Sequence, residues 1–170
     1  MNTQLAQAAI EADPDLPIIR ITRDFHATPA QLVKAHTDPD LALRWIGPDG
    51  MENRIITWDA RNGGEWRYVA SRAASGPDLN REEYVFRGCF HTVGDDVIVQ
   101  TFTWEGQPDG VSLETLRFED LGDGRTRLHA QSLVDSFESR DAWLRSGMEV
   151  GVNDGYAKLD ALIAAGTVAP

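Results

Sequence analysis

Cysteine is nearly missing from this 170-residue sequence: Cys89 stands alone, so no disulfide can form within the chain. A single cysteine is typical of proteins from a reducing compartment. Long apolar runs are missing too, since none approaches the length that crosses a bilayer. Residues 1–17 have neither the basic nor the apolar region of a secretory signal. These absences predict a cytoplasmic protein that does not act in a membrane.

Basic residues are scarce, because 16 lysines and arginines face 27 acidic residues and leave a formal net charge of −11. Binding to a phosphate backbone or to an anionic membrane requires clustered basic side chains. Here the basic side chains are scattered along the chain. Composition therefore argues against nucleic acid and membrane surfaces as partners, and the acidic excess mainly promotes solubility.

Motifs for metals, nucleotides and nucleophilic catalysis are also missing. There is no His-Glu-x-x-His sequence, no cysteine cluster and no Gly-x-Ser-x-Gly turn, and Gly63-Gly64 lacks the pattern of a phosphate-binding loop. We therefore expect no metal and no cofactor. Cys89 and His91 share one strand face and could form a Cys-His pair. An inert strand cysteine is the favoured interpretation.

The C-terminal stretch from Ser139 to Ala165 predicts one long amphipathic helix, with Ser139 as its N-cap and Gly166 just past its end. Apolar residues recur in it at spacings of three and four, which places them on one face. These residues are Leu144, Met148, Val152, Tyr156, Leu159, Leu162 and Ile163. The residues expected to point away from that face are Trp143, Ser146, Val150, Asn153 and Asp154.

Three glycines, Gly147, Gly151 and Gly155, recur in this helix at intervals of four. Each glycine costs an exposed helix about 1 kcal/mol relative to alanine, so three on one flank require a reason. Tight packing of the helix on a sheet is the favoured interpretation. A cavity wall beside the helix is the alternative.

The rest of the chain predicts a single α+β domain over residues 18–166, preceded by a loosely ordered segment, 1–17. Within that segment, residues 4–12 could form a short helix. Thr28-Pro29 and Asp38-Pro39 each combine an N-cap residue with proline at the first helical position, so each begins a short helix.

Alternating apolar residues between turn sequences predict strands through most of the remaining chain. One of the turns is Ser75-Gly76-Pro77-Asp78. The strands cover residues 18–25, 54–60, 65–71, 81–93, 96–106, 111–121 and 125–134. Strands joined by short loops pair antiparallel. We therefore expect a curved antiparallel sheet of six to seven strands, wrapped around the long C-terminal helix.

Alternation also gives each strand an inner face toward that helix. Side chains on the inner face, on the helix and in the turn before the sheet could line a ligand pocket, although aromatic residues in such positions also simply fill cores. The candidates are Trp45, Trp66, Tyr68, Tyr84, Phe86, Phe102, Trp104, Met148, Val152 and Tyr156. Gln100 is in phase with Phe102, but an outward-facing amide is the favoured interpretation.

Glu114 is a further candidate, because it is in phase with Leu116 and Phe118 on one strand. If that face is the inner one, burial would raise the pKa of Glu114 and fit it to act as a general acid or a ligand anchor. A partly exposed glutamate at a strand end, paired with an arginine, is the favoured alternative.

Several stretches carry a family resemblance. They are Arg23-Asp24-Phe25-His26-Ala27-Thr28-Pro29, Trp45-Ile46-Gly47-Pro48-Asp49-Gly50, Gly63-Gly64-Glu65-Trp66-Arg67-Tyr68, Phe86-Arg87-Gly88 and Gly124-Arg125-Thr126-Arg127-Leu128. With the order of elements, they resemble the START-like (SRPBCC, helix-grip, Bet v 1-like) superfamily. Within it, they resemble the homologues of the activator of heat-shock protein 90 ATPase. The resemblance implies a helix-grip fold with a cavity between sheet and long helix, used in the superfamily for apolar molecules.

Residues and resemblance together predict a non-enzymatic protein that binds a small apolar or amphipathic molecule. Glu114, Tyr68 or Arg67 would orient the polar end of that molecule. One alternative is an enzyme of the cyclase or hydrolase type, in which a carboxylate or histidine moves a proton in the same cavity. Another is a chaperone-related interaction module that acts through its surface. A homodimer could form through the sheet edges.

Overall fold

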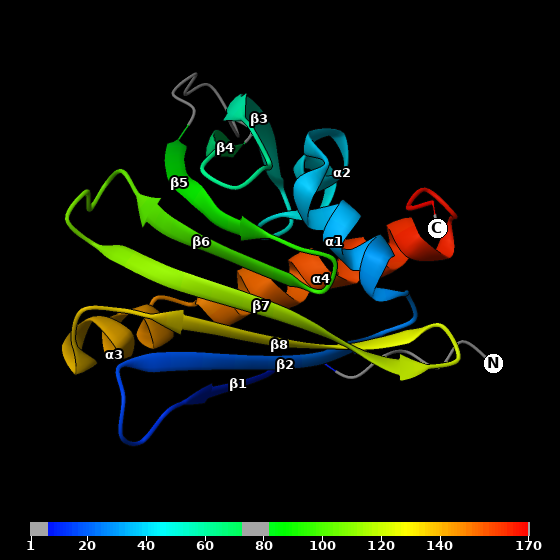
Figure 1. The fold of residues 1–170 in the computed structure, drawn as a ribbon. Coiled ribbons are helices and arrows are strands. Elements are labelled where there is room, and N and C mark those ends of the chain that lie inside the picture. The colour runs from blue at the N-terminus through cyan, green and yellow to red at the C-terminus, as the bar shows by residue number, and fades with distance from the viewer. Residues whose placement is uncertain (1–6, 73–81, 170) are drawn as a thin grey trace.

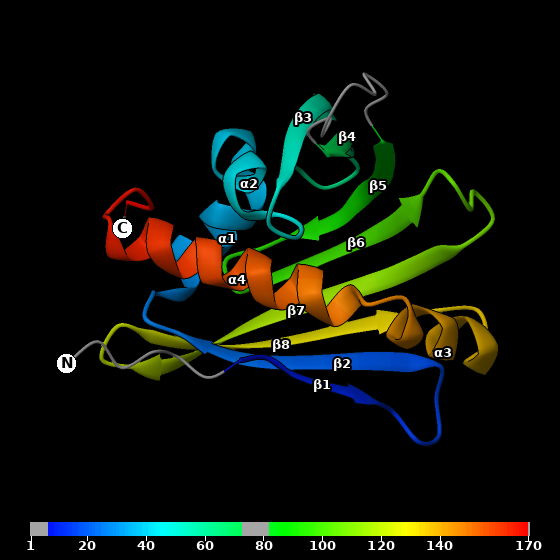
Figure 2. The ribbon, with the colours of Figure 1, turned by 180° about the vertical axis from the view of Figure 1, so that it is seen from behind.

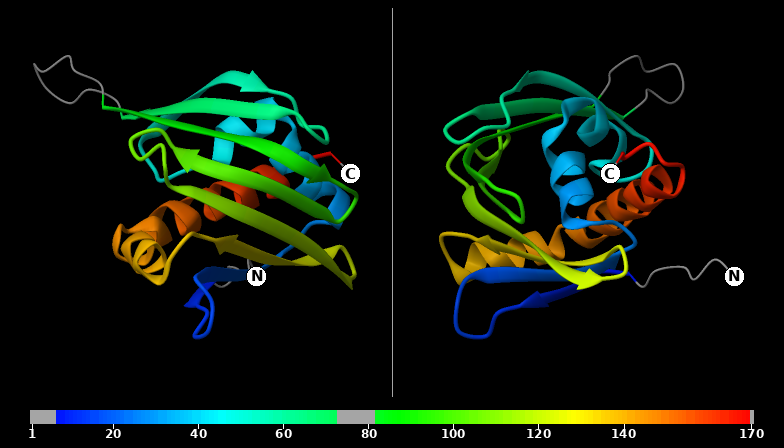
Figure 3. Two further views of the ribbon diagram at one scale, coloured as in Figure 1. Left: turned by 60° about the vertical axis from the view of Figure 1, so that its left-hand side comes forward. Right: turned by 45° about the vertical axis from the view of Figure 1, so that its right-hand side comes forward.

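The structure, a computed structural model, describes residues 7–72 and 82–169. An eight-stranded antiparallel sheet curls around the last helix (Figures 1 and 3). The strands are β1 (Ala9–Ala12), β2 (Ile18–Phe25), β3 (Met51–Trp58), β4 (Glu65–Arg72), β5 (Glu83–Val93), β6 (Val97–Trp104), β7 (Val111–Gly122) and β8 (Arg125–Leu133). The helices are α1 (Pro29–Thr37), α2 (Pro39–Trp45), α3 (Phe137–Arg145) and α4 (Met148–Ala164). Across the sheet the order is β1-β2-β8-β7-β6-β5-β4-β3.

This arrangement confirms the predicted α+β helix-grip class, and β2 to β8 lie where the sequence predicts strands. The turn predicted at 75–78 lies outside the described residues, as do residues 4–6 of the predicted N-terminal helix. For the described rest of that segment the helix prediction is wrong, because Ala9–Ala12 is extended and pairs with β2. The edge of β2 offers backbone partners there, and Ile10, opposite Ile21, packs against the core.

The two short helices begin where the sequence predicts. Thr28 accepts from the backbone N–H of Gln31, while the Gln31 side chain accepts from the backbone of Thr28, which completes a capping box. The Asp38 side chain caps α2 by accepting from the backbone N–H groups of Asp40 and Leu41, and Pro39 follows at the first helical position.

The long C-terminal helix, in contrast, is broken in two. Gly147 adopts a left-handed backbone conformation with φ of 85°, which ends α3 and starts α4 in a new direction (Figure 2). The N-cap of α3 is Ser136, not Ser139. Because of the break, Trp143 does not point away as predicted but packs on Phe102, with ring centroids 5.8 Å apart.

Helix α4 packs closely against the turn between α2 and β3. A Cβ atom at Gly155 would lie 3.0 Å from the carbonyl oxygen of Trp45. The ammonium group of Lys158 donates to the carbonyl oxygen of Gly47 at 2.8 Å. Tight packing therefore explains Gly155, although its neighbour is a turn and not the sheet.

Two polar residues of α4 are anchors, not simply solvated as the sequence predicts. The Asp154 carboxylate accepts from the backbone N–H of Asp49 at 3.0 Å, and Asn153 accepts from that of Ala8 at 3.0 Å. Val150 does face solvent, with 58% of its surface exposed. In the described part of the chain, no helix is long and apolar enough to cross a membrane.

Candidate functional site

The inner face of the sheet carries a continuous row of aromatic rings. Tyr68 on β4 lies opposite Phe86 on β5, and their ring centroids are 5.2 Å apart. Phe86 contacts Phe102 on β6 at 5.4 Å, and Phe102 contacts Trp66 at 5.7 Å. Four of the aromatic candidates thus lie together on the concave side, and these four are termed the aromatic row.

Trp66 fits into this row because the residue opposite it on the next strand, Gly88, has no side chain. A Cβ atom at Gly88, opposite Trp66, would lie 2.5 Å from an indole carbon, so only glycine leaves room for the ring. Trp66 is 3% exposed, and its indole N–H has no hydrogen-bond partner among residues 7–72 and 82–169. A buried donor without a partner is costly, so this N–H is available to a bound molecule or a water.

Three polar side chains lie on the same inner face, on adjacent strands. Gln100 on β6 is opposite Glu114 on β7, which is opposite Ser132 on β8. The Gln100 side-chain amide donates to Oε2 of Glu114 at 2.9 Å, and the Ser132 hydroxyl donates to Oε1 at 3.4 Å. These three residues are termed the Glu114 group.

The orientation of this group corrects two sequence interpretations. Glu114 is paired with no arginine of the ranges 7–72 and 82–169, and Gln100 does not face outward. The only register shift between β7 and β8 falls after Asp120, so Glu114 stays in phase with the buried Leu116.

Burial dominates the electrostatics of the Glu114 group. It raises the pKa of Glu114, while the hydrogen bonds from Gln100 and Ser132 oppose the rise because they stabilise the charged form. Burial and, second, the Glu114 charge raise the pKa of both Tyr68 and Tyr156. The two hydroxyls therefore lie within electrostatic reach of the carboxyl, one from β4 and one from α4.

One end of the concave face is less buried than the other. On α4, Tyr156 is buried, whereas Val152 and Met148, one and two turns earlier, are half-buried. The inward-facing Phe102 and Glu114 on the sheet are half-buried as well. Solvent thus reaches inward-facing side chains near the start of α4.

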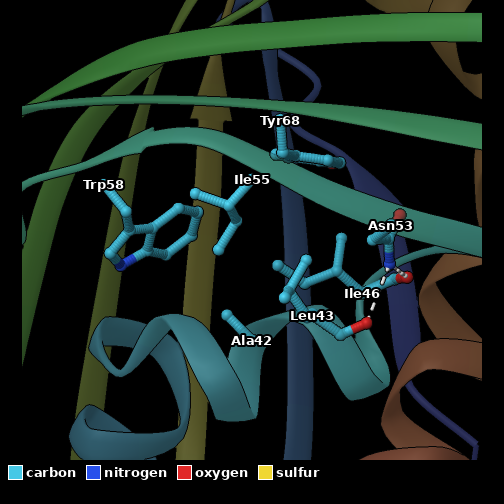
Figure 4. A pocket seen from close by; sticks show the side chains of 7 residues that line it. All are labelled: Ala42, Leu43, Ile46, Asn53, Ile55, Trp58 and Tyr68. Atoms are coloured by element: carbon cyan, nitrogen blue, oxygen red, sulfur yellow. Dashed lines mark hydrogen bonds between the residues drawn. The ribbon is translucent and has the colours of Figure 1, made fainter.

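A small hollow lies at the other side of Tyr68, between α2 and the inner face of β3 and β4 (Figure 4). Its lining residues are Ala42, Leu43, Ile46, Asn53, Ile55, Trp58 and Tyr68. The space is about 150 Å³, part of it open to solvent, and it is too narrow to admit a water molecule. The side-chain amide of Asn53 donates to the carbonyl oxygens of Leu43 and Ile46, which fixes this wall.

Three of the predicted aromatic candidates make no ring contact with the aromatic row in the described part of the chain, although one of them, Trp104, lies opposite Phe86 in the register of β5 and β6. Trp45 is buried, and its indole N–H donates to the carbonyl oxygen of Ala35 at 2.9 Å, so it serves the helix packing. Tyr84 and Trp104 contact each other at 6.4 Å, and Trp104 is 37% exposed.

Other predicted groups lie on the outer face of the sheet. Arg67 is bound by both oxygens of Glu105, so it cannot orient a ligand on the inner face. Cys89 is exposed, and His91 bonds to Thr92, so the Cys-His pair is absent.

A shallow hollow on the outer face of the sheet is lined in part by Arg20, Arg117 and His129, none of them a predicted site residue. The residues that the structure describes contain no cluster of three metal-ligating side chains.

Sequence reasoning missed two residues of the concave face. Ser132 alternates with Leu128 and Ala130 on β8, so the alternation that placed those two could have found it. Trp143 was missed because the break at Gly147 could not be foreseen.

The order of elements and the antiparallel sheet around a long C-terminal helix define a helix-grip protein of the SRPBCC, Bet v 1-like class. The sequence model of the Activator of Hsp90 ATPase homolog 1-like proteins matches residues 26–164. The chain therefore belongs to that family, and the resemblance read from its motifs is confirmed. No curated protein matches the sequence.

Solved structures share this fold at low sequence identity. A protein from Rhodobacter sphaeroides is 24% identical with a TM-score of 0.79, over 94% of this chain and 99% of that chain. Protein Ms6760 from Mycobacterium smegmatis is 23% identical with a TM-score of 0.78, over 94% and 97%. The AHSA1 protein from Silicibacter pomeroyi is 22% identical with a TM-score of 0.68, over 87% and 98%.

Proposed function

We propose that this protein binds a small, largely apolar molecule on the concave face of its sheet, between the aromatic row and helix α4. The supporting observation is the Glu114 group, which lies on the inner face of the sheet in phase with the apolar Phe102 and Leu116. Ligand sites combine apolar walls with a few placed polar groups, and this face has that composition.

Burial of apolar ligand surface would drive binding, at about 2.5 kcal/mol for each 100 Å² removed from water. Association itself costs several kcal/mol, so a ligand must cover most of the aromatic row to bind well. The hollow beside Tyr68 is too narrow even for water. A ligand that reaches past Tyr68 must therefore move that ring or the side chains of α2.

Native mass spectrometry of the protein purified from cells tests this proposal. We expect a reproducible mass increase that gentle denaturation releases as an apolar small molecule. Val152→Trp would fill the concave face and abolish the mass increase, whereas Val150→Trp on the exposed side of α4 would retain it. A clean apo mass, together with failure to bind an environment-sensitive apolar dye, would contradict the proposal.

A second candidate function is catalysis on the same face, because burial raises the pKa of Glu114 and so fits it to donate a proton. The two functions differ in the fate of the bound molecule. A binder releases it unchanged, whereas an enzyme converts it, and Glu114→Gln would stop the conversion.

A third candidate comes from the family description, which names the activation of the Hsp90 ATPase. Leu113 and Leu133 lie opposite each other on the outer face and are exposed, as a protein-interaction surface would require. Under this candidate, adding the protein would raise the ATP hydrolysis rate of Hsp90, and Leu133→Lys would reduce the increase.

A further inference from the structure

We propose that the ligand is an organic cation, a protonated amine joined to an apolar body, and that its charge lies against Glu114. This inference rests on the proposed function, because it takes the concave face as the binding site and specifies what binds there.

The first step is that Glu114 has no positive partner among the residues that the structure describes. Both of its oxygens accept hydrogen bonds, but the donors, Gln100 and Ser132, are neutral. These two hydrogen bonds stabilise the charged form of Glu114, whereas burial without a counter-charge disfavours it. A cation from outside the chain would remove this imbalance.

The second step is that nearby basic side chains are already engaged. Arg23 is bound to both oxygens of Asp160, and Arg67 is bound to both oxygens of Glu105 on the outer face. Lys158 donates to backbone carbonyls of the turn after α2. Each of these groups bonds to another carboxylate or to backbone carbonyls and none bonds to Glu114, so none of the three supplies its counter-charge.

The third step is that the surroundings suit an ammonium group. Aromatic ring faces attract cations, and the aromatic row reaches the Glu114 group at Phe102, two residues from Gln100 on the same face of β6. The hydroxyls of Tyr68 and Tyr156 make no hydrogen bond to any residue in the described ranges, so both can accept from ammonium N–H.

Other ligand charges fit less well. An anion would meet Glu114 directly, in a protein whose formal net charge is −11. A neutral alcohol or ketone would leave the carboxylate without a counter-charge.

Titration calorimetry at pH 7 with three probes of one chain length tests the inference: octylamine, octanol and octanoate. We expect the wild-type protein to bind octylamine about tenfold or more tightly than octanol, and octanoate more weakly than either. Glu114→Gln keeps the shape and hydrogen-bonding capacity of the side chain but removes its charge, so it should abolish the preference for the amine.

The matched control is Glu119→Gln, which removes the same charge from the same strand but on the exposed outer face. Glu119→Gln should keep the full preference for octylamine over octanol, because that preference comes from the charge of Glu114 and not from the overall negative charge of the surface. Phe102→Leu is a second variant, which removes one ring of the row and should weaken octylamine binding more than octanol binding.

The outcomes separate the two proposals. Equal affinity of wild type for octanol and octylamine would overturn the cation inference and leave the proposed function intact. A preference for the amine that survives in Glu114→Gln, or that is lost equally in Glu119→Gln, would also overturn the cation inference. Failure of all three probes to bind would overturn both.

Discussion

Two ion pairs differ in how much they contribute to folding stability, because one is buried and the other is exposed. Arg23 and Asp160 join β2 to α4, with side chains that are 5% and 27% exposed. Arg127 and Asp24 join β8 to β2 at the surface, with side chains that are 42% and 36% exposed. Solvent screens the second pair, whereas loss of Asp160 would leave a buried guanidinium without its partner.

Asp160→Asn is therefore expected to lower the free energy of unfolding by about 2–3 kcal/mol. The matched change Asp24→Asn should lower it by about 1 kcal/mol or less. Urea unfolding of both variants measures the two losses. Similar losses for both would contradict the distinction between buried and exposed pairs.

His36 is a second residue whose burial has a measurable consequence. Its ring packs against Trp45 and Phe118, and burial lowers its pKa from 6.5 to about 4. Between these pH values, His36 is therefore protonated in the unfolded chain but neutral in the folded protein. The contribution is fully present above pH 6.5 and is lost as the pH falls to about 4, by up to about 3 kcal/mol.

We expect His36→Gln to reduce the loss of stability between pH 7 and pH 5, as measured by urea unfolding at both values. His91→Gln, at an exposed position, should leave that loss unchanged. A pH dependence that is identical in wild type and His36→Gln would show that His36 is not buried in its neutral form.

For single residues, the sequence predicted which face of the sheet a side chain occupies better than it predicted the hydrogen-bond partners of that side chain. Alternation placed Trp66, Tyr68, Phe86 and Phe102 on one face, because strand periodicity is a local property. It could not choose between an inward and an arginine-paired Glu114, because the partners Gln100 and Ser132 belong to other strands.

Elements were predicted well where local signals begin them and poorly where backbone conformation ends them. The N-cap and proline pairs located α1 and α2. In the C-terminal stretch, Gly147, Gly151 and Gly155 have the same composition signal but three different environments. Gly147 has a φ of 85°, Gly155 packs against a backbone carbonyl, and Gly151 meets only Pro48 at an ordinary 3.5 Å.

The three glycines therefore respond differently to alanine. Gly151→Ala should raise the free energy of unfolding by about 0.5–1 kcal/mol, because alanine is the better helix former. Gly155→Ala should lower it by about 1 kcal/mol through the clash with Trp45, and Gly147→Ala by about 1–2 kcal/mol through its left-handed backbone. Thermal or urea unfolding of the three variants gives the signs, and an equal effect at Gly151 and Gly155 would contradict the packing described for α4.

The whole molecule is closed at one end and looser at the other. Helix α3 has no buried residue, whereas the later part of α4 contains the buried Gly155, Tyr156 and Leu159. The composition and element order predicted the helix-grip class, because that class follows from the succession of local patterns. They could not predict which end is open, because that depends on the break at Gly147 and on side chains from several strands.

Amide hydrogen exchange should be faster at the less buried end of the molecule. Amides of α3 and of the first turns of α4 are expected to exchange faster than those around Tyr156 and those of β7 and β8, because fewer buried contacts resist their opening. Mass spectrometry of exchanged peptides measures it. Protection of α3 as strong as that of β8 would mean that this end of the molecule is closed.

The most direct test of ligand binding on the concave face is a nuclear Overhauser measurement with octylamine bound to the protein. Binding beside the aromatic row predicts contacts from the alkyl protons to the methyl groups of Val152 and Met148, on the inner side of α4. Contacts to Leu113 and Leu133 on the outer face, with none to Val152, would contradict it.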